Sequence, residues 1–74
     1  MQFRGAVVCD AGTDVNGDDY CEIAAAGSHC VAACQAFQRA CLGAFVASAE
    51  EPCVQGEPAG CLAEQPHLRC RCFN

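Results

Sequence analysis

The spacing of four cysteines limits the fold more than any other feature of this sequence. Cys30 and Cys34 are four residues apart, and Cys70 and Cys72 are two residues apart. On a helix, residues four apart share a face and lie about 6 Å apart along the axis. On a strand, residues two apart also share a face, about 6.7 Å apart. Because the two spacings match, two adjacent disulfides can join a helix to a strand.

The cysteine content indicates an oxidising compartment. Nine cysteines among 74 residues are typical of a disulfide scaffold in a short secreted protein. A core of this size barely offsets the loss of chain entropy on folding, and each disulfide adds about 2–4 kcal/mol. The alternative is a thiolate metal site, which favours paired C-x-x-C motifs, and none occurs here. We therefore predict one secreted, disulfide-rich domain over residues 1–74, without a metal or cofactor.

The beginning of the chain and its hydropathy bear on targeting. The segment Met1-Gln2-Phe3-Arg4 is followed by too short an apolar stretch for a signal core, so we expect that a leader was removed. No apolar run approaches the roughly 20 residues that a membrane-spanning helix needs.

The charge is acidic. Nine Asp and Glu residues face four arginines (Arg4, Arg39, Arg69 and Arg71), and the net charge is −5. Nucleic-acid binding depends on neutralising phosphates, and anionic bilayers attract polybasic surfaces. We therefore expect neither nucleic acid nor an anionic membrane to be a strong partner.

The pattern of apolar and turn residues predicts two elements in the first third of the chain. Residues 3–9 are expected to form a short strand, and residues 10–19 to form turns rich in Asp, Asn and Gly. Residues 18–26 are expected to form a short helical turn, which Gly27 ends.

The middle of the chain predicts a long helix. Ser28 is a suitable N-cap, and Pro52 follows the expected end of the helix near residues 49–51. One helical face gathers residues within about 100° of arc: Cys30, Cys34, Phe37, Cys41, Ala44, Phe45 and Ser48.

The rest of the chain predicts a loop and a strand. Residues 52–66 contain repeated Gly and Pro, and residues 67–73 alternate as a strand does. Leu68, Cys70 and Cys72 fall on one face of this strand, and the other face carries Arg69, Arg71 and Phe73. We expect an α+β fold in which one long helix is clamped by disulfides to a short C-terminal antiparallel β element, with the N-terminal strand beside it.

The cysteine pattern of residues 28–74 resembles a known superfamily. The C-x-x-x-C helix and the tail HLRCRCFN are similar to the cysteine-stabilised αβ motif of defensins and scorpion-type toxins, and the spacing from Cys53 and Cys61 onward is similar to macins. The resemblance implies the pairs Cys30–Cys70 and Cys34–Cys72. The alternative is a mainly helical, cystine-rich fold in which the spacing is accidental.

Five cysteines remain outside that pairing, and the sequence does not decide how they connect: Cys9, Cys21, Cys41, Cys53 and Cys61. Cys41 shares the helical face of Cys30 and Cys34, which favours a core position. One cysteine must stay odd, which leaves either a capped thiol or an intermolecular disulfide that would make a homodimer.

Other candidate sites are weaker. Residues 14–19 imitate the start of a calcium loop, but its sixth and twelfth positions hold Asp19 and Ala25 instead of Gly and Glu, so we interpret the segment as an acidic turn. His29 and His67 have no nucleophile motif beside them and are interpreted as surface residues. We therefore do not expect an enzyme.

Two sets of residues are candidates for a binding surface. Arg69, Arg71 and Phe73 would form a basic and aromatic patch on the C-terminal strand. Val31 and Leu42 flank the cysteine face of the expected helix; they either pack under the N-terminal segment or, if exposed, form a contact patch.

Three functions follow from these observations. The first is a toxin-like or effector-like ligand that binds an extracellular protein or another cell-surface target. The second is the host-defence antimicrobial activity that the defensin resemblance implies, although the acidic charge weighs against membrane lysis. The third is protease inhibition by the loop of residues 50–65.

Overall fold

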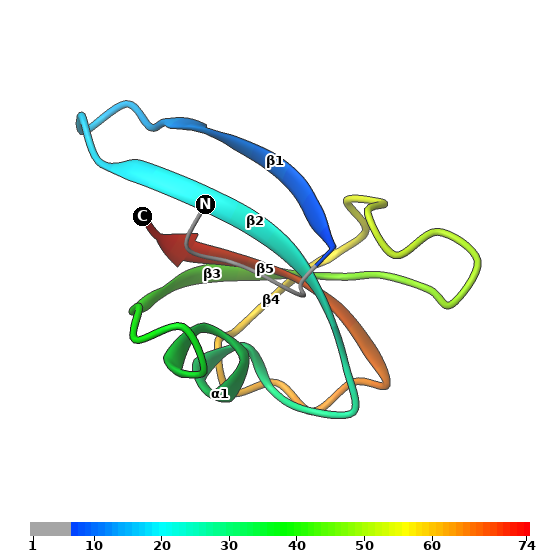
Figure 1. The fold of residues 1–74 in the computed structure, drawn as a ribbon. Helices are drawn as coiled ribbons and strands as arrows, with labels where there is room; N and C mark the ends of the chain where they lie inside the picture. Colours follow the sequence, from blue (N-terminus) through cyan, green and yellow to red (C-terminus); the bar gives the residue numbers. More distant parts are fainter. Residues whose placement is uncertain (1–6) are drawn as a thin grey trace.

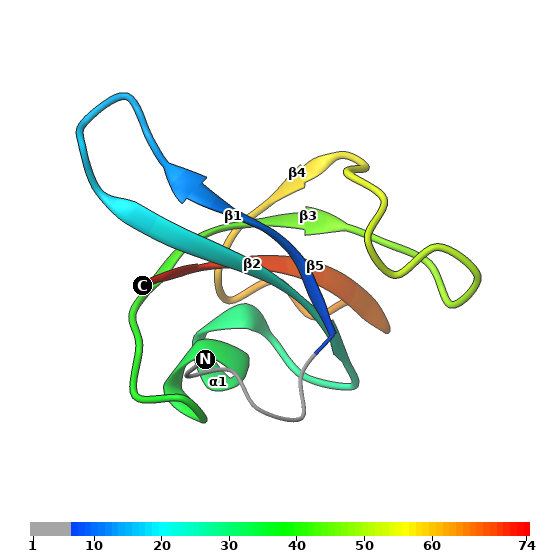
Figure 2. The same ribbon diagram turned by 45° about the horizontal axis from the view of Figure 1, so that its top comes forward.

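The computed structural model describes residues 7–74 and shows a five-stranded antiparallel sheet with one short helix on one face (Figure 1, Figure 2). The elements are β1 (Val8–Thr13), β2 (Asp19–Ala26), α1 (Cys30–Gln35), β3 (Cys41–Val46), β4 (Pro58–Ala59) and β5 (His67–Phe73). The order of strands in the sheet is β1-β2-β5-β3-β4. The predicted fold class is therefore wrong: the sheet dominates, and the described helix has six residues.

The first two strands form a hairpin where the sequence indicated turns and a helical turn. The Asp14 amide donates to the Asp18 carbonyl at 2.9 Å, and the Gly17 amide donates to the Asp14 carbonyl at 3.1 Å. Gly17 has a φ of 85°, so this is a three-residue turn with glycine in the left-handed position. Residues 10–13 are strand rather than turn, and residues 19–26 are strand rather than helix. The predicted strand at 3–9 lies mostly outside the described residues.

Helix α1 is much shorter than the helix predicted from Ser28 to about residue 50. His29, not Ser28, is the N-cap, and its Nδ1 accepts the Ala32 amide at 3.1 Å. The helix ends at Gln35, and Gln38 then adopts a left-handed φ of 60°, a common way to end a helix. The structure thus divides the predicted helix into α1, a turn and strand β3.

Residues 41–46 form strand β3 because they supply backbone hydrogen bonds to one edge of β5. It pairs along β5, with Ala44 opposite Cys70 and Val46 opposite Leu68. A helix through these residues would leave that edge of β5 without backbone hydrogen bonds, which is costly in a buried segment. Gly43 and Val46 also disfavour helix. Tertiary pairing therefore overrides the helical spacing of the apolar residues.

Strand β5 confirms the predicted C-terminal strand, with the same limits, His67–Phe73. It is central, pairing with β2 on one side and β3 on the other. The predicted alternation also holds, because Leu68, Cys70 and Cys72 are fully buried.

The core lies between the sheet and α1, and most of its residues are cysteines. Its eight buried apolar residues are Cys21, Ile23, Cys30, Cys34, Ala44, Leu68, Cys70 and Cys72. The structure joins Cys30 to Cys70 and Cys34 to Cys72, the pairing that the resemblance implies.

Two further disulfides and one thiol complete the cysteine framework. Cys41 in β3 bonds to Cys61, and Cys9 in β1 bonds to Cys53. Cys21 in β2 keeps a buried thiol. The disulfides to Cys53 and Cys61 attach the long segment between β3 and β5 to the sheet, in addition to the pairing of β4 with β3.

No helix within residues 7–74 is long and apolar enough to cross a membrane.

Candidate binding surfaces

The sheet face opposite α1 carries an ionic network rather than an exposed basic patch. Glu22 of β2 is 1% exposed. Its Oε1 accepts from Nη2 of Arg69 at 2.7 Å, and its Oε2 lies 3.2 Å from Nη2 of Arg71. Nη1 of Arg69 also donates to the Cys53 carbonyl at 2.6 Å. We call Glu22, Arg69 and Arg71 the Arg–Glu–Arg network.

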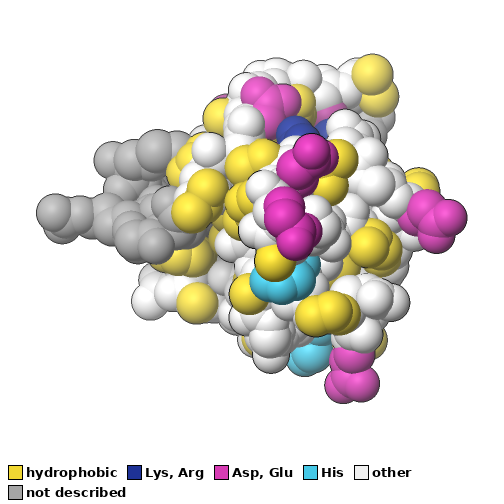
Figure 3. Space-filling view, turned by 90° about the vertical axis from the view of Figure 1, so that its right-hand side faces the viewer, with side chains coloured by type: hydrophobic (Ala, Val, Ile, Leu, Met, Phe, Trp, Pro, Cys, Tyr) yellow, Lys and Arg dark blue, Asp and Glu magenta, His cyan; other side chains and the backbone are white. Residues whose placement is uncertain are grey.

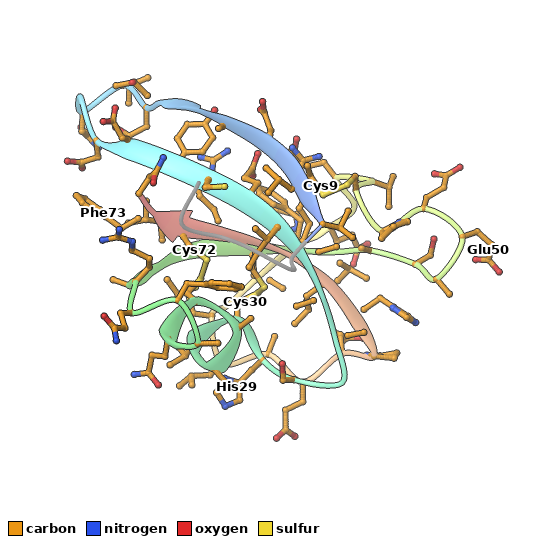
Figure 4. The ribbon with its side chains drawn as sticks, viewed as in Figure 1. Cys9, His29, Cys30, Glu50, Cys72 and Phe73 are labelled. Carbon is orange, nitrogen blue, oxygen red and sulfur yellow. A yellow bond between two sulfur atoms is a disulfide. The ribbon has the colours of Figure 1, made fainter. Side chains whose placement is uncertain are left out.

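Aromatic rings cover part of this network. The Arg71 guanidinium lies 4.4 Å from the centre of the Tyr20 ring and 6.0 Å from that of Phe45, within range of cation–π attraction. Phe73 is 41% exposed and lies at the C-terminal end of β5 (Figure 4). Both arginines of the predicted patch are thus engaged by Glu22, while Phe73 is available at the surface.

The second predicted set is not gathered on one element. Val31 is half-buried on α1, whereas Leu42 is 41% exposed on β3, at the bulge between Cys41 and Gly43.

The ion pairs of Glu22 were not predicted from the sequence, although residues 19–25 carry the pattern of the strand that positions this side chain. Residues 19–25 alternate, with Cys21, Ile23 and Ala25 on one side and Tyr20 and Glu22 on the other. That period of two indicates a strand. A strand placed beside β5 would set Glu22 opposite Arg71, as the register shows.

Eight of the nine carboxylates lie at the surface, exposed or half-buried. They fall on three regions: β1 and its hairpin, the segment between β3 and β4, and the loop before β5. The residues are Asp10, Asp14, Asp18, Asp19, Glu50, Glu51, Glu57 and Glu64. Figure 3 shows carboxylates spread over one face of the molecule, on which arginine side chains are barely visible. Glu50 lies at the tip of the loop that projects from the sheet (Figure 4).

The Asp14 carboxylate stabilises the turn of the hairpin between β1 and β2. Oδ1 of Asp14 accepts the amides of Asn16 and Asp18, at 2.9 and 3.0 Å, and Oδ1 of Asp19 accepts the Thr13 hydroxyl at 2.7 Å. Among residues 7–74, no group of three or more His, Cys, Asp or Glu side chains is arranged to hold a metal ion.

A cleft of about 460 Å³ lies beside the start of α1. Gly27, Ser28, His29, Glu64 and Gln65 line it. Because Nδ1 of His29 accepts the Ala32 amide, the neutral ring carries its proton on Nε2 and offers a donor there. His67 lies on β5 instead and is half-buried.

The odd cysteine is Cys21, and it is enclosed by the core. Burial raises the pKa of the Cys21 thiol, and the carboxylates of Glu22 and Asp10 raise that pKa further. A protonated, buried thiol is a poor nucleophile. An intermolecular disulfide through Cys21 would require the sheet to open.

Comparisons with protein-family models, curated proteins and solved structures find no match to this chain.

Proposed function

We propose that this protein is a secreted, non-enzymatic binding protein whose target is a positively charged extracellular protein. The observation that carries this proposal is the separation of arginines from carboxylates: two of the arginines are paired with a buried carboxylate, and the other carboxylates lie at the surface. Glu22 neutralises one of two arginines inside the Arg–Glu–Arg network, whereas eight carboxylates lie at the surface. A surface of one sign attracts partners of the opposite sign, and this raises association rates and selects among partners.

The disulfides support a binding role because they hold the acidic segments in place. Cys9–Cys53 connects β1 to the segment that carries Glu50, Glu51 and Glu57, and Cys41–Cys61 connects β3 to the loop that carries Glu64. A preorganised loop loses less conformational entropy when it binds, which favours affinity. Four disulfides in a small domain also fit an oxidising, extracellular environment.

The state of the titratable groups supports a non-enzymatic role. The cysteines are bonded apart from the buried Cys21, and Nδ1 of His29 is occupied by a backbone amide. General base or nucleophilic catalysis needs such groups accessible and paired with each other.

Binding of the protein to a panel of cell types tests the proposal. Fluorescently labelled protein should bind one cell type saturably, unlabelled protein should compete, and affinity should fall as salt is raised from about 0.15 to 0.5 M, because exposed charges are screened. Reduced and alkylated protein is the control and should not bind.

Other outcomes would assign another function. Salt-sensitive killing of bacteria without saturable binding would favour the antimicrobial role. A stoichiometric loss of protease activity would favour inhibition by residues 50–65. Paired charge-neutral variants, D18N/D19N in the hairpin and E50Q/E51Q in the projecting loop, then show which acidic segment contacts the target.

A further inference from the structure

The two edges of the sheet differ in how well they are protected. Strand β4 has two residues and begins with Pro58, and both features discourage pairing with another strand. Strand β1 has six residues, and its last four, residues 10–13, are all exposed. This segment, which we call the open edge, contains no Lys and no Pro. Its bulge lies at one end only, between Val8 and Asp10.

The register identifies the backbone groups that point outward. Along two antiparallel strands, hydrogen-bonded pairs alternate with non-bonded pairs. The Asp14 amide donates to the Asp18 carbonyl at the end of the hairpin, so these two residues form a hydrogen-bonded pair. Two positions along, Gly12 and Tyr20 are the next hydrogen-bonded pair. Ala11 and Thr13 fall opposite Cys21 and Asp19 in the non-bonded pairs. Their amides and carbonyls therefore face away from β2.

We propose that the open edge of β1 accepts an extended segment of the target as a sixth strand, and that this segment carries Lys or Arg. Ala11 and Thr13 supply two amides and two carbonyls, which can form up to four backbone hydrogen bonds with it. Strand addition of this kind takes its affinity from main-chain bonds and its specificity from side chains. The inference rests on the proposed function, because it names the surface that the basic target contacts.

The charge around the open edge favours a basic segment. Asp10 lies within the edge, and Asp14, Asp18 and Asp19 surround its other end at the hairpin. A lysine or arginine on the added strand would lie near these carboxylates, and opposite charges across strands are stabilising. A second copy of this chain would instead bring the same carboxylates together, at a net charge of −5 on each copy.

A peptide titration followed by nuclear magnetic resonance tests this surface. The probe is a capped heptapeptide of alternating Lys and Val, and the counterpart is alternating Glu and Val. With the Lys peptide at millimolar concentration, the amide signals of Ala11 and Thr13 should shift, and their hydrogen exchange should slow. The Glu peptide should bind at least tenfold more weakly. Equal binding of the two peptides, or no change at these two amides, would overturn the proposal.

Two variants of Ala11 test whether peptide binding depends on the backbone of the open edge. Ala11→Pro removes an outward amide without removing a bond to β2, so it should keep the fold and weaken the Lys peptide about threefold to tenfold, the loss of one hydrogen bond. Ala11→Val keeps that amide and is the matched control. If A11P and A11V bind equally, the open edge is not the site.

The same variants distinguish failure of this inference from failure of the proposed function. Saturable cell binding that A11P does not change would leave the function standing and move the contact elsewhere. Absence of saturable binding by the natural chain would refute the function, while the peptide titration would still decide the chemistry of the edge. A concentration-dependent dimer in sedimentation, lost in A11P, would assign the edge to a second copy and overturn the basic-segment proposal.

Discussion

Replacing Glu22 with Gln should destabilise this protein more than removing any surface carboxylate. The change keeps the shape of the side chain, so it removes charge without leaving a cavity. Both arginines of the network then lose the carboxylate that they share, Arg69 in a largely buried position and Arg71 in a more exposed one. The side chain of Glu22 is 2% exposed, and those of Arg69 and Arg71 are 12% and 30% exposed.

The magnitude follows from the two contacts. A hydrogen bond to a charged group contributes about 1.5–3 kcal/mol when it is buried, which applies to the 2.7 Å contact between Glu22 and Arg69. The contact with Arg71 is longer, at 3.2 Å, and nearly a third of that side chain is in solvent, so about 0.5–1 kcal/mol is appropriate. Glu22→Gln should therefore cost about 2–4 kcal/mol.

Urea denaturation is the suitable assay, because urea is uncharged and does not screen ion pairs as guanidinium does. With an m-value near 1 kcal/mol per molar, the midpoint should fall by about 2–4 M. Glu57→Gln removes an exposed carboxylate and should change stability by less than about 0.5 kcal/mol.

A double-mutant cycle isolates the interaction. Arg69→Met loses its bond to the Cys53 carbonyl as well as the bond to Glu22, and the cycle with E22Q subtracts the former. A coupling energy of at least about 1 kcal/mol is expected. If E22Q costs no more than E57Q, or the coupling vanishes, the network is not the structural support that we describe.

The remaining predictions concern the cystine framework and the charge. Replacing Cys30 and Cys70 with Ala should cost more than replacing Cys9 and Cys53, as measured by urea denaturation; the loops are similar, at 40 and 44 residues, but only the first pair is fully buried. Intact mass without reductant should show four disulfides, and the native protein should resist alkylation at its one thiol, Cys21. Because the pKa of that thiol in the folded protein is raised above 9.0, the stability that the protonated thiol contributes is complete below pH 9 and declines as the pH rises further; a Cys21→Ala variant should therefore lose less stability than the natural chain as the pH is raised above 9, as measured by urea denaturation. Vesicles of anionic lipid should not leak at about 0.15 M salt, because each basic residue contributes only about 1 kcal/mol and the Arg–Glu–Arg network engages two of them; dye release at low micromolar protein would contradict this.

The sequence predicts one part of the fold well, because there the local pattern and the tertiary pairing agree. Alternation in residues 67–73 requires a strand, and the final sheet places that strand at its centre. The spacing of Cys30 and Cys34 likewise suits one turn of helix, and α1 provides that turn, although the helix predicted to continue to about residue 50 ends at Gln35.

The rest of the fold depends on partners that are distant in sequence. Residues 41–46 repeat apolar side chains at a spacing that suits a helix, and only their pairing with β5 makes them a strand. In β2, Ala24, Ala25 and Ala26 favour helix in isolation, yet they pair with residues 67–69. The same limit applies to the candidate surface. Local alternation placed Arg69 and Arg71 on one face, but the ion pairs with Glu22 follow from a neighbour 47 or 49 positions away.

The central position of β5 has a consequence for biosynthesis. It is the last of the six elements in the described part of the chain, yet it joins the β1–β2 half of the sheet to the β3–β4 half. The sheet therefore cannot be completed until residue 73 has emerged from the ribosome. Until then Cys30 and Cys34 are thiols without their native partners, next to Cys21 and to cysteines that can already pair. Any wrong pair that formed before residue 73 emerged would have to be resolved by thiol–disulfide exchange.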